Sequence, residues 1–145
     1  MALLEEIGGK LAALGLCSSS GANGWVLIKS WLPDSTVMPH KVVALTETGG
    51  YPPLLPVELD YPTFSVRVRG DVSAAVSGAY SAARTEIENI KLALHGLGSV
   101  MLPTTSSPSQ YYVEVKATQE PSLLHYDQQQ RPVLVCNFSA IRSRT

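Results

Sequence analysis

Apolar and polar side chains alternate in a stretch near the middle of the chain. Phe64, Val66 and Val68 alternate with three polar residues, Ser65, Arg67 and Arg69. This period of two is typical of a strand with one buried face. We therefore predict a strand from Tyr61 onward whose two arginines share the face opposite the apolar side chains and look outward.

A helical pattern follows this strand directly. Gly70 breaks the alternation, and Asp71 is a suitable N-cap because its carboxylate can accept hydrogen bonds from the free amides of a first helical turn. Apolar residues then recur every three or four positions, at Val72, Val76, Ala79, Ala83, Ile87, Ile90 and Leu94. This spacing predicts one long helix that continues to His95, is roughly 35 Å long, and is stopped by Gly96 at the C′ position.

The segments before the central strand predict a short helix and a hairpin. Leu3 or Leu4, Ile7, Leu11 and Leu14 lie on one face of a helix that Gly15 ends. Residues 25–32 and 41–47 have the composition of strands, and Pro33-Asp34-Ser35 between them predicts a turn, so we expect these strands to pair as a hairpin. Gly49-Gly50 suggests a closing turn, and the four prolines of residues 50–62 predict an extended arm.

The segments after the long helix predict two strands and two loops. Residues 111–118 alternate and predict a strand, while residues 133–141 are apolar on both faces, which is typical of a central strand. Residues 99–110 and 119–131 are polar or rich in proline, so we expect them to be loops that are mobile in the free protein and ordered in an assembly. The chain is predicted to be one α+β domain over residues 1–145, with a mostly antiparallel sheet of about five strands and a long and a short helix on one face.

Composition narrows the classes of function. Hydrophobic residues make up 45% of the chain and charged residues 16%, and the formal net charge is -1, so broad attraction to nucleic acid or to membranes is not expected. Residues 1–60 hold three lysines and six acidic residues, which gives a formal net charge of -3. Residues 61–145 hold eight basic and six acidic residues, which gives +2. No apolar run is long enough for a membrane span, and we expect no secretion signal and a reduced, cytoplasmic folding environment.

Candidate catalytic and metal-binding groups are sparse. His40, His95 and His125 are scattered, and His95 suits the role of a cation at a helix C-terminus. Cys17 and Cys136 lack the spacing of a metal site, and Cys136 lies in an apolar strand as a small hydrophobic residue does. Catalysis by Cys17 with a distant histidine is the weaker alternative to a structural role, because most lone cysteines are structural. We therefore expect no enzyme activity, no metal and no cofactor.

Two readings remain for the polar and aromatic residues of the strands. Tyr111 and Tyr112 beside Lys116, with Arg67 and Arg69, could form a stacking platform for nucleic acid, although the motif of RNA-recognition strands is missing. The other reading is a protein interface, in which arginines pair with carboxylates of a neighbouring subunit. For that interface we select Arg67, Arg69, Tyr112, Glu114, Lys116, Glu120, Asp127 and Arg131.

Several segments, in this order and spacing, resemble the minor capsid or tail terminator family of long-tailed bacteriophages. The opening segments are Trp31-Leu32-Pro33-Asp34, Val42-Val43-Ala44-Leu45 and Glu47-Thr48-Gly49-Gly50. The central block is Tyr61 to Gly70, the helix with Tyr80 and Ile90, and Leu94-His95-Gly96. The ending is Pro121, Asp127 and Arg131 followed by Val135-Cys136-Asn137-Phe138, and the likeness covers roughly residues 24–142.

The resemblance implies a structural virion protein of the phage neck, assembled in the host cytoplasm. Proteins of that family form hexameric rings that end the tail tube and join it to the head connector, so the implied partners are further copies of this chain, the tail tube protein and a head completion or connector protein. DNA in the ring lumen is a further possible contact, and no membrane is involved. Gln128-Gln129-Gln130 departs from the family pattern, where a tighter Asp, Asn or Gly turn is expected. The alternatives are a head-side connector or stopper protein and, in a different class, a small nucleic-acid-binding module.

Overall fold

The computed structural model describes residues 3–29, 40–51, 59–73, 77–102 and 110–143. Within these ranges the helices are α1 (Leu3–Ala13) and α2 (Ala79–Leu94). The strands are β1 (Val26–Lys29), β2 (Val42–Tyr51), β3 (Leu59–Arg69), β4 (Leu97–Leu102), β5 (Gln110–Ala117), β6 (Ser122–Tyr126) and β7 (Pro132–Ser143). The predicted α+β class is confirmed, with more strands than the five expected.

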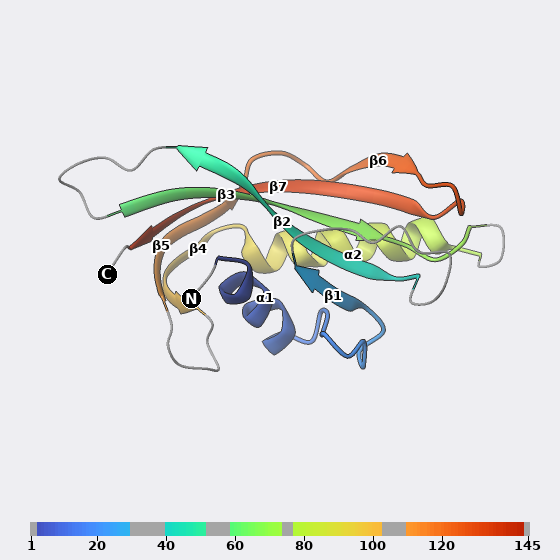
Figure 1. Ribbon diagram of the computed structural model, residues 1–145, viewed down its shortest axis with the longest axis horizontal. Coiled ribbons are helices and arrows are strands. Elements are labelled where there is room, and N and C mark those ends of the chain that lie inside the picture. Colours follow the sequence, from blue (N-terminus) through green and yellow to red (C-terminus); the bar gives the residue numbers. More distant parts are fainter. Residues whose placement is uncertain (1–2, 30–39, 52–58, 74–76, 103–109, 144–145) are drawn as a thin grey trace.

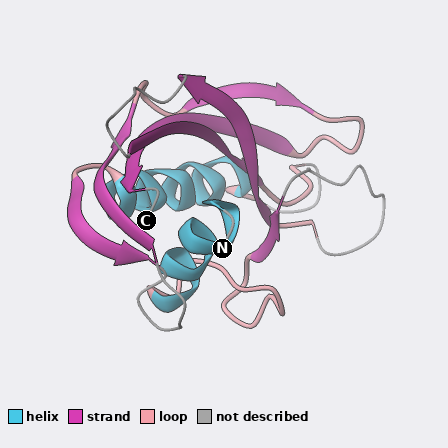
Figure 2. Ribbon diagram, turned by 60° about the vertical axis from the view of Figure 1, so that its left-hand side comes forward, coloured by secondary structure: helices cyan, strands magenta, loops and turns pink. Residues whose placement is uncertain are grey.

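The strands form one mostly antiparallel sheet in the order β1-β2-β3-β7-β5-β4, and β6 also pairs with β7. Strand β7 is central, as its two apolar faces predicted. Strand β3 lies along one side of it, and β5 and β6 follow one another along the other side. The sheet curves around α1 and α2, which both lie on its concave side (Figures 1 and 2).

The core lies between the two helices and this concave face. Phe64, Val66 and Val68 of β3 point into it, as their alternation predicted. Phe64 stacks on Phe138 of β7 with ring centroids 5.2 Å apart. The buried residues of α2 are Ala79, Ala83, Glu86, Ile87, Ile90 and Leu94. The predicted apolar stripe is therefore confirmed from Ala79 onward.

The predicted start of the long helix is wrong. Helix α2 begins at Ala79, after Gly78, whose φ of 79° is left-handed and therefore suits glycine. Val72 lies before the helix, and the Asp71 carboxylate accepts a hydrogen bond from the Val72 amide at 2.9 Å instead of capping a helix. Val76 lies outside the described residues. The predicted end is correct, because Gly96 follows the C-cap residue His95 with a φ of 86°.

The predicted hairpin between the first two strands is also wrong. Strand β1 pairs with β2 in parallel, and residues 33–35 of the expected turn lie outside the described residues. Gly49 and Gly50 do not close a turn either. They lie within β2 at an irregularity in its pairing with β3, where a Cβ on Gly50 would stand 2.2 Å from the Tyr61 carbonyl oxygen. Both glycines have positive φ, at 97° and 120°, and Pro62 of the expected arm lies in β3 opposite Gly50.

The two predicted loops contain strands. Residues 99–102 belong to β4 and residues 122–126 to β6, so these parts are hydrogen-bonded into the sheet. Residues 103–109 lie outside the described part of the chain. The mobility of the remaining loop residues stays a prediction.

Candidate assembly interface

Three of the predicted interface residues lie on the convex face of the sheet. Arg67 pairs in register with Ala44 and Val135, and its side chain is exposed. Lys116 is exposed on the same face, and its Nζ lies 3.7 Å from the Glu114 Oε1. Next to this pair is a shallow depression of about 350 Å³ that reaches Tyr61 and Thr63. Arg67, Glu114 and Lys116 therefore lie on a surface that a partner can reach.

Arg69 shares that face but is not exposed, which corrects the prediction. It is 1% exposed, and its Nε donates a hydrogen bond to the His40 carbonyl oxygen at 2.9 Å. Its neighbours on the convex face, Val42 and Val133, are buried as well. Strand alternation identifies the face on which a side chain lies. It does not tell whether that end of the face is open to solvent.

Arg131 and Asp127 form a buried ion pair at the turn between β6 and β7, so Arg131 is not an exposed interface residue. Arg131 is 0% exposed, and its Nε donates to Asp127 Oδ2 at 2.8 Å. Asp127 Oδ1 also accepts from the amides of Gln129 and Arg131, at 2.9 and 3.0 Å. Burial by itself raises the pKa of Asp127, but the hydrogen bonds and the charge of Arg131 outweigh it, so the pKa is lowered.

This carboxylate explains how three glutamines form the tip of the hairpin. Gln130 has a φ of 60°, a left-handed conformation that glycine or asparagine adopts more easily. Its amide donates to the Asp127 carbonyl oxygen at 3.0 Å, and the Asp127 amide donates to the Arg131 carbonyl oxygen at 3.1 Å. The last hairpin expected from the resemblance is present. Its turn is held by Asp127, in place of the residue type expected at the tip.

Tyr112 is buried, which corrects its assignment to the exposed interface. Tyr112 pairs with Arg142 and Glu114 with Ile141, so Val113 is an extra residue in β5. This β-bulge turns Tyr112 to the concave side and leaves Glu114 and Lys116 on the convex side. The Tyr112 hydroxyl donates to Glu6 Oε1 of α1 at 2.5 Å, and burial and this hydrogen bond raise its pKa. A stacking platform that uses both tyrosines is therefore not present.

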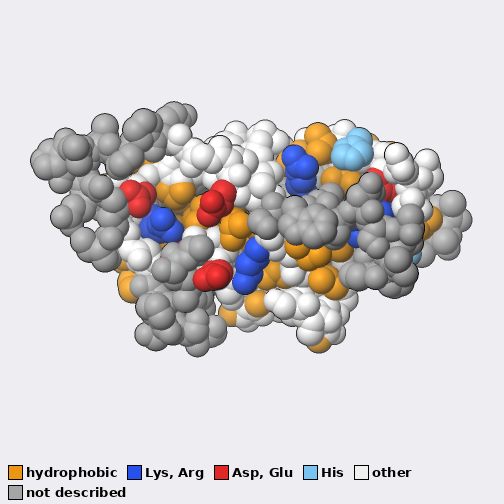
Figure 3. Space-filling model, viewed as in Figure 1, with side chains coloured by type: hydrophobic (Ala, Val, Ile, Leu, Met, Phe, Trp, Pro, Cys, Tyr) orange, Lys and Arg blue, Asp and Glu red, His pale blue; other side chains and the backbone are white. Residues whose placement is uncertain are grey.

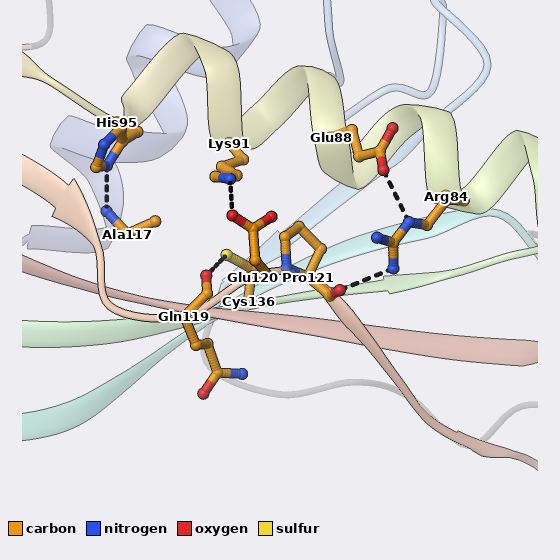
Figure 4. Close-up of polar contacts among 9 residues, drawn as sticks. All are labelled: Arg84, Glu88, Lys91, His95, Ala117, Gln119, Glu120, Pro121 and Cys136. Atoms are coloured by element: carbon orange, nitrogen blue, oxygen red, sulfur yellow. Dashed lines mark hydrogen bonds and ion pairs between the residues drawn. The ribbon is translucent and has the colours of Figure 1, made fainter.

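Glu120 belongs to a set of polar contacts between α2 and the segment that joins β5 to β6 (Figure 4). Lys91 Nζ donates to Glu120 Oε1 at 2.7 Å, and Arg84 Nη1 donates to the Pro121 carbonyl oxygen at 2.7 Å. The hydrogen bond and charge of Lys91 lower the pKa of Glu120. These contacts fix the point where the chain leaves β5 and enters β6, so Glu120 has a structural role and is also exposed.

His95 takes part in the same set of contacts. Its Nδ1 accepts a hydrogen bond from the Ala117 amide at 2.9 Å. His95 thereby joins the end of α2 to the end of β5, and its expected role as a cation at the helix end stays a prediction.

Strand β6 is the feature that the sequence interpretation missed. All five of its residues are exposed, including Leu123 at 42%, Leu124 at 46% and Tyr126 at 45%. Figure 3 shows hydrophobic side chains beside a histidine at the upper right of the view, where β6 lies in Figure 1. The run Ser-Leu-Leu-His-Tyr is the sequence signal, since it interrupts a segment that is otherwise polar.

Helix α2 also buries a carboxyl group that no sequence pattern indicated. Glu86 is 6% exposed, and its Oε2 has no hydrogen-bond partner among the described residues. Burial raises its pKa to about 7, and the charge of Lys41 opposes this shift only in part. Burial and the charge of Glu86 in turn raise the pKa of the Cys17 thiol to about 12.

Replacing Glu86 with glutamine is expected to make stability less dependent on pH. Because the folded state holds the proton to a higher pH than the unfolded state does, Glu86 lowers stability as pH rises from about 4.5 to about 7, and this loss persists above that range. Urea unfolding at pH 8 should show Glu86→Gln to be about 1–3 kcal/mol more stable than the unchanged protein, with a much smaller difference at pH 5. Glu88→Gln, on the exposed side of α2, is the control. An equal gain at both pH values would contradict this account.

The described parts of the chain contain no group of three or more His, Cys, Asp or Glu side chains placed to hold a metal ion. Among the same residues, no helix has the length and apolar character needed to cross a membrane.

Comparison with known proteins gives information on the fold only. No known family matches the sequence, and no curated protein does. Among solved structures, the chain is similar to a chain of the "Virion of native gene transfer agent (GTA) particle", with a TM-score of 0.66 and 14% sequence identity. The similarity covers 98% of this chain and 95% of that chain. The two chains therefore share an overall fold over nearly their whole lengths.

Proposed function

We propose that this chain is a structural protein of a phage-like virion, and that it forms a hexameric ring in the neck that ends the tail tube and joins it to the head connector. The observation that carries this proposal is the shared fold with a chain of a gene transfer agent virion, over nearly the full length of both chains. The resemblance of the sequence segments to the tail terminator family supports the finer assignment.

The exposed surface supports an assembly role. Arg67 of β3 and the pair Glu114 and Lys116 of β5 lie on the convex face of the sheet, and β6 exposes apolar side chains at a sheet edge. Charged groups at the rim of an interface set orientation and register, while apolar groups supply association energy. The proposed partners are further copies of this chain, the tail tube protein and a head completion or connector protein, with DNA as a further contact in the lumen.

The division of the predicted interface residues follows from their burial. Arg67, Glu114, Lys116 and Glu120 remain candidates for direct contact with a partner. Arg69, Tyr112, Asp127 and Arg131 support the sheet, the last hairpin and the position of α1 from inside. This division is itself testable, because exposed contact residues change assembly alone, whereas supporting residues change stability.

Native mass spectrometry of the isolated protein, with class-averaged electron micrographs, tests the proposal. We expect a six-subunit mass and a ring with a central hole. Recombinant rings should bind purified tail tubes at one end. A monomer that binds oligonucleotides in a salt-dependent way would contradict the proposal and favour a nucleic-acid-binding module. Rings that bind only the head connector would favour a head-side stopper protein.

Reversing the charge of Arg67 is expected to affect assembly without affecting folding. Arg67 is exposed and makes no ion pair among the described residues, so Arg67→Glu should change the free energy of unfolding by less than about 1 kcal/mol. The variant should lose ring formation or tail joining while the subunit keeps its melting temperature. Lys29→Glu makes the same change of charge at the exposed last residue of β1 and should leave rings intact. Normal rings and tail joining with Arg67→Glu would mean that Arg67 is merely solvated, and Arg69→Glu is expected to unfold the subunit because Arg69 is buried.

A further inference from the structure

Exposed apolar side chains are concentrated on two separate parts of the sheet. Of the nine large hydrophobic side chains that are exposed among the described residues, six lie on these two parts. Leu123, Leu124 and Tyr126 belong to β6, which we call the β6 edge. Met101 of β4 and Tyr111 and Val113 of β5 form the second group, which we call the β4–β5 patch, and they are 47%, 37% and 39% exposed. Met101 and Tyr111 are direct partners in the β4–β5 pairing.

Both groups lie beside an open strand edge. Within the described ranges β6 pairs only with β7, and β4 pairs only with β5. The third outer strand, β1, is different, because Ser18 bonds to its outer side: the Leu27 amide donates to the Ser18 carbonyl oxygen at 2.8 Å. An open edge presents unpaired amide and carbonyl groups that pair with another strand.

Neither open strand carries the charged residues or prolines that usually prevent pairing with another chain. The sequences of β6 and β4, Ser-Leu-Leu-His-Tyr and Leu-Gly-Ser-Val-Met-Leu, contain no lysine, arginine, carboxylate or proline. In β6, Leu123 pairs with Leu134 and His125 with Val133, so Leu124 is an extra residue outside the regular pairing. Its side chain is thereby left exposed at the edge, and no charge has to lose water when the edge is covered.

We propose that the β6 edge of one copy binds the β4–β5 patch of the next copy. The occupant is a second copy because one chain carries both an open edge whose strand has no acidic or basic residue and a separate apolar patch beside another open edge. The charge next to the patch, Glu114, is already paired with Lys116 at 3.7 Å. A contact between two different surfaces of identical chains is head-to-tail, and it closes into a ring when the rotation between copies divides a full turn evenly. This inference rests on the proposed ring function and names the surfaces that build the ring.

Cross-linking between single-cysteine variants tests this contact in the full chain. Leu124→Cys and Met101→Cys proteins are mixed and treated with a short bismaleimide, and we expect a covalent dimer only when both variants are present. The double variant should give a ladder of covalent oligomers up to the full ring. The native Cys17 and Cys136 are buried, and burial raises their pKa to about 12 and about 11, so they should not react. Leu92→Cys, on the outer side of α2, replaces either partner as the control and should give no dimer.

A charge substitution at the β6 edge tests the same contact without a cross-link. Leu124→Lys places a charge at the β6 edge without changing a buried residue, and it should raise the protein concentration needed for half-assembly at least tenfold while the melting temperature of the subunit stays unchanged. Leu92→Lys is its control and should assemble normally.

The outcomes separate this inference from the proposed function. Rings that form normally with Leu124→Lys and give no Leu124–Met101 cross-link would overturn the inference and leave the ring function standing. Dimers of Leu124→Cys alone would show that two β6 edges meet each other, which also overturns it. Head-to-tail covalent oligomers from a protein that forms open filaments would support the inference while the neck-ring function fails.

Discussion

Replacing Asp127 with alanine is expected to lower the free energy of unfolding by about 3–5 kcal/mol at pH 7. The change removes the acceptor of the Arg131 Nε and leaves the guanidinium of a side chain that is 0% exposed without its counter-charge. It also removes the acceptor of the amides of Gln129 and Arg131, which hold the turn. Urea unfolding followed by circular dichroism measures the loss.

The pH dependence distinguishes the ion pair from a general packing defect. The pKa of Asp127 is lower in the folded state than in the unfolded state. Its contribution to stability is therefore fully present above the unfolded-state pKa and is lost as pH falls through the folded-state pKa. The difference in the free energy of unfolding between Asp127→Ala and the unchanged protein should therefore become smaller in strong acid. Glu120→Ala removes a carboxylate of similar pairing whose side chain is 80% exposed, and it should change stability little. Similar losses from both variants would mean that burial does not decide the strength of these pairs.

Replacing Ile90 with alanine is expected to cost about 2–5 kcal/mol of stability. Ile90 is fully buried where α2 packs on the concave face of the sheet, next to Ile87 and Leu94 of the same stripe. Truncation removes apolar contact area and leaves a cavity between a helix and a sheet, neither of which can easily close it. The measurement is the midpoint of urea unfolding at an unchanged slope.

Glu88 is the control on the same helix. Its side chain is exposed and pairs with Arg84 at 2.8 Å, one turn earlier, so Glu88→Ala should cost less than about 0.5 kcal/mol. Equal losses at positions 88 and 90 would mean that the helix does not present its Ile87–Ile90 face to the sheet.

Local chemistry predicted those parts of the fold that depend on neighbours in the sequence. The period of two identified β3 and its buried residues Phe64, Val66 and Val68, and the period near 3.6 identified the buried face of α2 from Ala79 onward. Gly96 correctly marked the end of the helix, since its φ of 86° suits glycine. The all-apolar run in β7 correctly placed that strand in the middle of the sheet.

Side-chain periodicity did not predict the features that arise from pairing between strands. A single extra residue at Val113 reverses the faces of β5, so Tyr112 is buried while Glu114 and Lys116 remain on the other side. The sequence predicts a loop where β6 lies because the flanking residues are polar, whereas the strand is formed by hydrogen bonds from β7. For the candidate site, the period of two correctly predicts the exposed face of Arg67, whereas Arg69 on the same face is buried.

The sequence by itself determined the class of fold, the buried faces of β3 and α2, and the central position of β7, because side-chain periodicity and glycine conformation are local properties of the chain. Only the tertiary structure decided the parallel pairing of β1, the burial of Arg69 and Arg131, the carboxyl group enclosed at Glu86 and the open edge at β6. Each of these depends on which distant segment lies alongside, and it is the covering segment that sets the exposure, hydrogen-bond partners and charge state of a side chain.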